Sequence, residues 1–345
     1  MSIYVIHHSH HIVIELYLWG GILNNSIIIY IIMFKNRIIN GEKVPTEACL
    51  CEDECNDDTP TLFKYPWFCW LSTGCGGSLL QMDYETRQGL VVTAAHCVYG
   101  NYKSGPIENI RNFTCKFTHT EHTTPHQDPT AQVFYVTHVF IDPAYNPETF
   151  ENDVAFLIIH LDKPMLKDVC RTNLQTVNEM VDQNIDWYQN FDPANKSYFI
   201  QVDDLPIIPD ETTQFLPLFD KNSNSTSTTS NSDVTFIGAG TIKEIKIDAT
   251  TGEYFTNPGE SFADGLMKGY ASLMDPDYYK KYYDLLDIRR DLVLTRKDSD
   301  DISRAAPGDS GSLVFIENDN KIYALGVCSH GQTVVKYENN KIIID

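Results

Sequence analysis

A histidine, an aspartate and a serine in three separate motifs could together carry out nucleophilic catalysis. His96 ends an apolar segment in T-A-A-H-C (93–97), Asp153 begins one in N-D-V-A-F-L (152–157), and Ser310 lies between glycines in G-D-S-G-S (308–312). A serine hydroxyl is a weak nucleophile at neutral pH. It needs an imidazole to accept its proton and a carboxylate to fix the tautomer of that imidazole. Each motif alone is common at structural positions, but together they predict acyl-transfer chemistry.

The order of these residues along the chain restricts the scaffold that could hold them. An α/β-hydrolase has the order serine, aspartate, histidine, with the serine in a G-x-S-x-G turn. Here the order is His96, Asp153, Ser310, and Ser312 stands where the last glycine of that turn would be. The sequence therefore favours a different fold.

The elements that must position the three residues are short apolar runs separated by turn residues. Runs of this length and spacing are typical of an all-β sandwich or barrel. One helix is expected at 276–286, because Asp275 suits an N-cap and Pro276 suits the first turn. The polar, low-complexity stretch 221–233 is expected to be a surface insert. The runs expected as strands are 67–71, 77–80, 90–95, 132–141, 154–161, 234–237, 291–295, 312–316 and 322–327.

Further segments, read in order, resemble the trypsin/chymotrypsin-like serine protease family over nearly all of residues 38–331. In the segment F-I-G-A-G-T (236–241), Ala239 replaces the tryptophan that the family has there. Because several such segments in the same order rarely arise by chance, the chain is identified by resemblance as a member. The segments are R-I-I-N-G (37–41), C-G-G-S-L-L (75–80), T-A-A-H-C (93–97), N-D-V-A-F-L (152–157), F-I-G-A-G-T (236–241), G-D-S-G (308–311) and G-V-C-S-H-G (326–331).

This resemblance implies an all-β fold of two antiparallel β-barrels with the catalytic cleft between them. It divides the chain into a leader with an activation segment (1–37) and a peptidase domain (38–345). Within that domain, the first barrel would cover about 38–165 and the second about 234–345. A long insert, at about 175–233, would lie between the two barrels. The 14 residues after Gly331 are too few for the family's final strand and its C-terminal helix. Either the chain continues or the second barrel is closed in another way.

The resemblance also assigns roles to the site residues. Ser310 would be the nucleophile, His96 the general base and then acid, and Asp153 the orienting carboxylate. The backbone N–H groups of Gly308 and Ser310 would form the oxyanion hole. Cleavage between Arg37 and Ile38 would free an α-amino group to pair with Asp309, so the protein is expected to be a zymogen activated by another protease.

Substrate binding is expected from residues on either side of Ser310. The backbone of Ser329, His330 and Gly331 would pair with a protein or peptide substrate as an added strand, and the Ser329 hydroxyl would bond Asp153. Read without gaps from Ser310, the specificity position is Arg304, which would accept acidic side chains and repel basic ones. A small gap in this alignment would instead place a nearby acid in the pocket. The pocket would then bind basic side chains of the substrate. The acids concerned are Asp298, Asp300 and Asp301. The family's bridging cysteine is replaced by Ala306.

Nine cysteines leave at least one without an intramolecular partner. By the resemblance, Cys75 and Cys97 form the disulfide beside the catalytic histidine. A Cys69–Cys115 pair is a second expectation, between neighbouring first-barrel strands. The acidic segment 49–58 holds Cys49, Cys51 and Cys55. Disulfides or free thiols are expected there rather than a zinc site, and no metal or cofactor is expected for the reaction.

The net charge of −21, from 47 acidic and 26 basic residues, argues against a general nucleic-acid binder and against docking on anionic lipid.

The apolar run 12–34 is long enough to be a cleaved signal or a signal-anchor. A secreted protein is expected, with a membrane-anchored one as the alternative. The alternative to an active endopeptidase is a catalytically weak or inactive homologue that acts as a binding or regulatory protein. Four sequons, at Asn24, Asn112, Asn195 and Asn224, are compatible with secretion.

Overall fold

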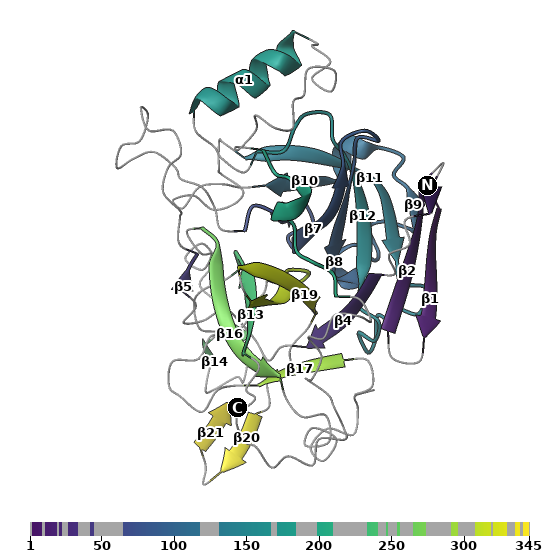
Figure 1. Cartoon of the computed structure of the whole chain (residues 1–345). Coiled ribbons are helices and arrows are strands. Elements are labelled where there is room, and N and C mark those ends of the chain that lie inside the picture. Colours follow the sequence, from purple (N-terminus) through teal and green to yellow (C-terminus); the bar gives the residue numbers. More distant parts are fainter. Residues whose placement is uncertain are drawn as a thin grey trace.

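The computed structural model of the 345-residue chain describes its backbone in segments that include most of two sheets (Figure 1). The described residues are 2–8, 11–18, 21–22, 27–33, 42–44, 65–117, 131–166, 171–183, 199–209, 233–240, 246–247, 254–255, 265–273, 291–295, 308–318, 320–329, 335–338 and 341–344.

Six strands form a closed first barrel. Their order is β10-β6-β7-β8-β12-β11, and β10 pairs with both β6 and β11, which closes the ring. Two-residue β9 (Gly105–Pro106) adds to β11. Buried positions alternate along β10, as expected for strands with one face toward a core. The strands are β6 (Phe68–Leu71), β7 (Gly76–Asp83), β8 (Gln88–Thr93), β10 (Thr114–Phe117), β11 (Gln132–Ile141) and β12 (Ala155–His160).

A second ring of six strands has the order β4-β17-β16-β13-β18-β19, and the β4–β19 pairing closes it. The predicted all-β fold of two barrels is confirmed. One strand departs from the antiparallel pairing, because β4 runs parallel to both of its neighbours in the ring. The strands are β4 (Ile27–Met33), β13 (Asp233–Gly238), β16 (Met267–Leu273), β17 (Asp291–Thr295), β18 (Leu313–Asn318) and β19 (Lys321–Cys328).

The N-terminal residues contribute more strands than β4. A hairpin of β1 (Ser2–His8) and β2 (His11–Leu18) extends the second sheet, because β2 pairs with β4. Short β3 (Gly21–Ile22) pairs with β2, and β5 (Glu42–Lys43) pairs with β16. Two small hairpins complete the described strands: β14 (Lys246–Ile247) with β15 (Tyr254–Phe255), and β20 (Val335–Glu338) with β21 (Lys341–Ile344).

One α-helix, α1 (Arg171–Asp182), is described, and it overlaps the start of the long interval expected to be an insert. Val177 of this helix packs in a small cluster with Leu166 and Phe199. Short 3-10 turns cover Ala95–Cys97, Ile110–Asn112 and Val202–Asp204. The helix expected at 276–286 lies outside the described residues. None of the helices described is long and apolar enough to cross a bilayer.

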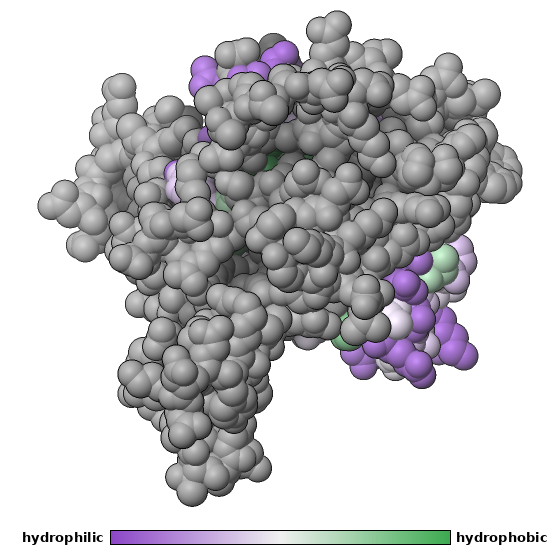
Figure 2. All heavy atoms as spheres, turned by 90° about the horizontal axis from the view of Figure 1, so that it is seen from below, coloured by the Kyte–Doolittle hydropathy of each residue, from purple (hydrophilic) through white to green (hydrophobic). Residues whose placement is uncertain are grey.

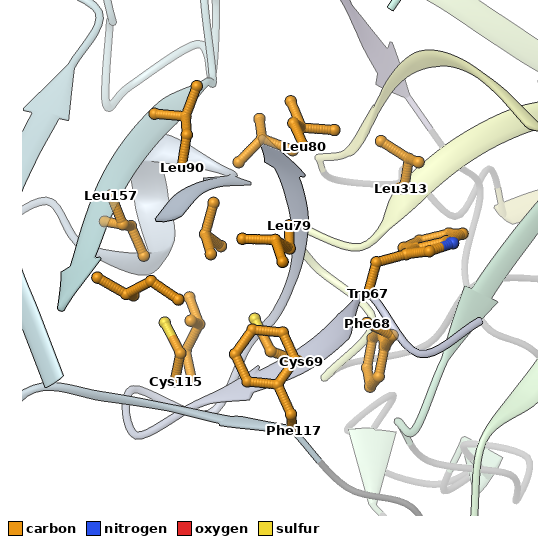
Figure 3. Packing of buried hydrophobic residues seen from close by; sticks show 14 of the residues in the cluster. Trp67, Phe68, Cys69, Leu79, Leu80, Leu90, Cys115, Phe117, Leu157 and Leu313 are labelled. Carbon is orange, nitrogen blue, oxygen red and sulfur yellow. The ribbon is translucent and has the colours of Figure 1, made fainter. Parts of the chain in front are cut away.

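A hydrophobic core joins the two barrels. Figure 3 shows first-barrel side chains such as Leu79, Leu90 and Leu157 packed together, with Trp67 reaching toward Leu313 of the second barrel. The ring of Trp67, which precedes β6, meets that of Phe315 in β18 edge-on, with ring centroids 5.5 Å apart. Aromatic contacts of this kind contribute about 0.5–1.5 kcal/mol beyond the area they bury. The two barrels are therefore held together at a common hydrophobic interface.

The described residues on one face of the molecule are largely polar (Figure 2). Seen from below, the described residues that reach the surface gather mainly at one edge and are mostly hydrophilic, with a few hydrophobic ones between them (Figure 2). Isolated apolar residues on a surface are ordinary in soluble proteins, so this face gives no indication of a docking site among the residues described there.

Candidate active site

Strand pairing in the first barrel brings His96 and Asp153 together. β8 ends at Thr93 and is followed by the 3-10 turn that holds His96, while Asp153 lies two residues before β12. Because Thr93 pairs with Ala155 across the two strands, the residues that follow one and precede the other meet at the same barrel end. The motifs predicted to carry a catalytic histidine and aspartate are thus adjacent in space.

Two hydrogen bonds connect this pair. Asp153 Oδ1 accepts from the His96 backbone N–H at 2.8 Å, and Asp153 Oδ2 lies 2.7 Å from His96 Nδ1. The carboxylate is fully buried, whereas the His96 side chain keeps 24% of its surface exposed. A buried carboxylate needs hydrogen-bond donors. The arrangement leaves one edge of the imidazole accessible and fixes Nδ1 toward the carboxylate.

The second barrel supplies a further donor to Asp153. The Ser329 hydroxyl donates a short hydrogen bond to Asp153 Oδ2. Ser329 directly follows β19, so this contact crosses from the second barrel to the first. The same oxygen of Asp153 therefore serves both His96 and Ser329, which ties the relative position of the barrels to the orientation of the imidazole.

Ser310 lies in a tight turn between the barrels. Its carbonyl accepts from Gly76 N–H of the first barrel at 2.8 Å, and its Oγ lies 3.4 Å from the carbonyl oxygen of Ser329, to which it donates. The following Gly311 has φ +82° and donates to the carbonyl of Cys328 at 2.7 Å. A Cβ at Gly311 would lie 2.4 Å from the Gly76 carbonyl oxygen. This turn therefore requires glycine after the serine.

Ser310 and His96 are close to the same residues but are not bonded to each other. Among the described contacts, no hydrogen bond joins the Ser310 hydroxyl to the imidazole; His96 Nε2 instead lies 3.7 Å from the sulfur of Cys97. Nucleophile–base hydrogen bonds are often long before substrate binds. The structure thus places all three predicted catalytic residues around Ser329, with the serine–histidine contact open.

The predicted oxyanion donors lie on either side of Asp309. Gly308 has φ +99°, a conformation that favours glycine, and within the described residues the backbone N–H groups of Gly308 and Ser310 have no protein acceptor. Free N–H groups beside a nucleophile are suited to bind an oxygen that develops negative charge. The turn is therefore compatible with the predicted role.

The Asp309 side chain lies in a buried site. The carboxylate accepts from Gly240 N–H at 2.8 Å, and a Cβ on Gly238 would lie 2.0 Å from its Oδ1. Gly238 pairs with Met267 of β16, and Met267 pairs with Lys43 of β5. The chain just after the predicted activation junction therefore runs close to Asp309. Arg37 and Ile38 themselves lie outside the described residues.

The cysteines divide into bonded and free. Cys75 and Cys97 are joined by a disulfide with a Cα–Cα distance of 6.0 Å. Their sulfurs and His96 form a compact group, but disulfide sulfurs are not the thiolates that bind zinc. The predicted Cys69–Cys115 disulfide is wrong: both thiols are free and buried. Cys49, Cys51, Cys55 and Cys170 lie outside the described residues.

Strand register explains why Cys69 and Cys115 are neighbours without forming a disulfide. Cys115 pairs with Leu71, so Cys69 is two residues from the position directly opposite. Such diagonal neighbours have Cα atoms about 7–8 Å apart, beyond the usual range for a disulfide. Both side chains lie in the first-barrel core near Phe117 (Figure 3). Burial, with a hydrogen bond to Cys115 as the second cause, raises the pKa of Cys69 well above its usual range.

Two neighbours of the His96–Asp153 pair were not predicted from the sequence. Phe150 has φ +60° and its ring meets that of His96 edge-on, with centroids 5.5 Å apart. Tyr145 lies in contact with Tyr99, and burial, with the charge of Asp153 as the second cause, raises its pKa. Both lie in the loop that precedes Asp153. The unusual aromatic content of that loop was the only signal that could have indicated them.

Arg304, His330 and Gly331 lie outside the described residues, as do Asp298, Asp300 and Asp301. The structure therefore brings together His96, Asp153, Ser310 and Ser329, with Gly308 and Asp309 beside them.

The comparisons with known proteins agree with this geometry. A family model described as Trypsin matches residues 59–215, just under half of the chain. Mannan-binding lectin serine protease 1 of Rattus norvegicus is 32% identical over 115 residues, which cover 30% of this chain and 15% of that protein. The Homo sapiens protein of that name is 33% identical over 113 residues, which cover 29% and 15%. The chain thus matches only a small part of these relatives. Residues 59–215 therefore match the trypsin family model, and the fold of two barrels is consistent with that of trypsin-like serine proteases.

Proposed function

We propose that this protein is a serine endopeptidase that uses Ser310, His96 and Asp153. The observation that carries the proposal is the position of Asp153, which is buried and bonded to both the His96 imidazole and the Ser329 hydroxyl while Ser329 also accepts from Ser310. A buried carboxylate that fixes Nδ1 leaves Nε2 to accept a proton. No purely structural need explains why Asp153 binds both His96 and the residue whose carbonyl contacts Ser310.

In the proposed reaction, Ser310 Oγ attacks the carbonyl carbon of the scissile peptide bond while His96 Nε2 takes the hydroxyl proton. The oxyanion that forms accepts from the N–H groups of Gly308 and Ser310. His96 then gives its proton to the leaving amine, and an ester to Ser310 remains. Water then attacks the carbonyl carbon of that ester while His96 takes its proton. His96 returns the proton to Ser310 Oγ as the ester bond breaks, which frees the acid and restores the Ser310 hydroxyl.

Activation by cleavage at Arg37–Ile38 is part of the proposal. Asp309 is buried and keeps its carboxylate toward Gly240, and β5 holds residues 42–43 against β16 next to that site. Ile38 lies four positions before Glu42, a span of about 14 Å when extended. A new α-amino group at Ile38 could therefore reach Asp309, and a buried carboxylate gains most from a paired charge.

We also propose an extracellular location and protein or peptide substrates. The disulfide between Cys75 and Cys97 suits an oxidising compartment, and Asn112 of a predicted glycosylation site is exposed. Arg304 would select substrates with Asp or Glu before the cleaved bond. A peptide library tests this, because preference for Lys or Arg would instead assign the pocket to one of the three nearby acids.

A catalytically weak or inactive homologue is the second candidate. It is favoured by one observation: among the described residues the Ser310 hydroxyl bonds the Ser329 carbonyl and not His96. Such a protein would bind other proteins through the cleft without cleaving them.

Peptide hydrolysis by the cleaved chain distinguishes the two candidates. The protein is cut at Arg37 by an added Arg-specific protease, which is then inhibited and removed, and N-terminal sequencing confirms a start at Ile38. Hydrolysis that is absent in Ser310→Ala, and absent in Arg37→Gln after the same treatment, supports the endopeptidase. Equal rates for the cut wild type and cut Ser310→Ala would refute it.

A further inference from the structure

Strand β4 is held on both sides in the second barrel. Its residues Tyr30, Ile31 and Ile32 pair with Gly326–Cys328 of β19, and Ile31, Ile32 and Met33 pair with Asp291–Val293 of β17. In Figure 1 this N-terminal strand lies next to β17, below β19. A segment predicted to be a leader is thus a central strand of the barrel that carries Ser310.

The barrel depends on this strand for closure. In the described part of the chain, only β4 connects β17 to β19. Without it, the ring opens and both neighbours become edge strands with unpaired N–H and C=O groups along one side. Such edges bind other strands or aggregate, and barrels avoid this by closing fully.

The sequence of β4 suits the place it occupies. Its residues are IIIYIIM, a continuous run of apolar and β-favouring residues without a charge. Strands with parallel neighbours on both sides typically show such continuous runs, whereas half-exposed strands alternate. The apolar character that resembled a signal or an anchor is therefore equally what a parallel barrel strand requires.

Strand β4 also supports the active serine through β19. The stretch that pairs with β4 includes Cys328, whose N–H donates to Ser312 and whose carbonyl accepts from Gly311. The next residue, Ser329, bonds Asp153 and accepts from Ser310. A change in the β4–β19 pairing would therefore move the backbone that holds both the nucleophile turn and the carboxylate.

We propose that β4 is a permanent strand of the second barrel, which remains bound after the chain is cut between Arg37 and Ile38. β4 ends at Met33, four residues before Arg37, and β5 begins at Glu42, four residues after Ile38. The cut thus falls between two paired strands. The part of this inference that concerns the cut rests on the proposed activation; the closure of the barrel does not.

Retention of the N-terminal fragment tests the proposal. After cleavage at Arg37, the protein is passed over a size-exclusion column in native buffer and then in denaturant, and fractions are identified by mass. We expect fragment 1–37 to elute with the 38–345 body in native buffer and to separate only in denaturant. Elution of the free fragment from a folded wild-type body in native buffer would overturn the proposal.

Two proline variants make the test specific. Ile31→Pro removes an N–H at a position paired on both sides, where proline is not tolerated. Ile27→Pro changes the first residue of the strand, which pairs only with Ile14 of β2, and proline is acceptable at such a position. We expect the fragment to be lost from cut Ile31→Pro and kept by cut Ile27→Pro. Equal retention by both variants would contradict the assigned pairing.

Hydrogen exchange of the uncut chain provides a measurement that needs neither cleavage nor activity. In Ile31→Pro, the amides of 326–328 should exchange at least about tenfold faster than in the wild type and in Ile27→Pro, which corresponds to an opening free energy lower by about 1.4 kcal/mol. Unchanged protection in Ile31→Pro would overturn the closure role. If protection changes as expected but the cut protein does not hydrolyse peptides, the closure stands and the proposed function fails.

Discussion

Asp153 holds His96 at two points, with one oxygen on the backbone N–H at 2.8 Å and the other 2.7 Å from Nδ1 of the ring. This double contact fixes both the position of the turn and the orientation of the imidazole. Because the Asp153 side chain is fully buried, the contact is little weakened by solvent. The relationship makes Asp153 the residue at which fold and proposed chemistry are most closely joined.

Replacing Asp153 with asparagine should therefore abolish most activity without unfolding the protein. The amide keeps the shape but can no longer fix the tautomer in which Nε2 accepts a proton, so we expect kcat to fall by roughly 10⁴-fold. Steady-state hydrolysis of a peptide by the cut protein measures this effect. The control is Asp83→Asn, which changes a carboxylate in the β7–β8 turn. A loss in Asp153→Asn no larger than in Asp83→Asn would contradict the role of Asp153.

Ser329→Ala should reduce activity more modestly. It removes the hydroxyl that donates to Asp153 from the second barrel, while the Ser329 backbone carbonyl near Ser310 stays. A hydrogen bond to a charged group contributes about 1.5–3 kcal/mol, so we expect kcat/KM to fall at least about tenfold. The fall should lie in kcat rather than KM, because the change acts on the carboxylate and not on substrate. Ser329→Thr, which keeps a hydroxyl, should retain more activity than Ser329→Ala, and the reverse order would count against a positioning role.

Ser312→Ala should stabilise the protein. Ser312 is fully buried, and its hydroxyl has no hydrogen-bond partner among the described residues. Because an unpaired buried hydroxyl is unfavourable by about 1–3 kcal/mol, alanine removes that penalty and keeps the Cβ. Urea denaturation should show a higher midpoint with an unchanged slope. The matched control is Ser72→Ala, which removes an acceptor of Thr114 N–H and should lower the midpoint. A lower midpoint for Ser312→Ala would contradict this account.

The free energy of unfolding should decrease at alkaline pH because of the buried thiols. Burial raises the pKa of Cys69, and burial with the nearby charge of Asp309 raises that of Cys328. Since the folded pKa lies above the unfolded value of about 8.5, the stability from these neutral thiols is fully present below that pH and is lost as the pH rises through the folded pKa.

Urea denaturation at about pH 7 and about pH 9.5 measures this decrease. Cys69→Ala should be less stable than the wild type at the lower pH, because it leaves a small cavity, but its stability should fall less between the two pH values. A decrease identical to that of the wild type would show that Cys69 does not contribute.

Much of the geometry of the candidate site could be predicted from the sequence because the proposed catalysis restricts residue types and order. The motifs around His96, Asp153 and Ser310 indicated the proposed chemistry and the family resemblance. Two strands, 132–141 and 291–295, were predicted with the bounds observed. Apolar runs with turn residues at both ends determine such strands locally. The role of the glycines in the turn around Ser310 could likewise be predicted, since it depends on local backbone conformation.

Features that depend on distant partners could not be predicted. Helix α1 has few apolar residues, and Val177 is buried only because Leu166 and Phe199 lie against it. The apolar run of β4 is compatible with a signal, an anchor or a strand, and its barrel partners lie more than 250 residues away. The Cys69–Cys115 pairing failed because strand register, which places the two cysteines diagonally, is not visible in the sequence.

Covalent labelling of the nucleophile tests the central claim most directly. The chain, cut between Arg37 and Ile38, is incubated with a fluorophosphonate, and the modified peptide is identified by mass spectrometry. We expect a single adduct on Ser310 that is lost in Ser310→Ala and in His96→Ala, and that is strongly reduced in uncut Arg37→Gln. Correctly cut, folded protein that remains unlabelled, or that is labelled at another serine, would contradict the proposal that this barrel pair is a serine endopeptidase.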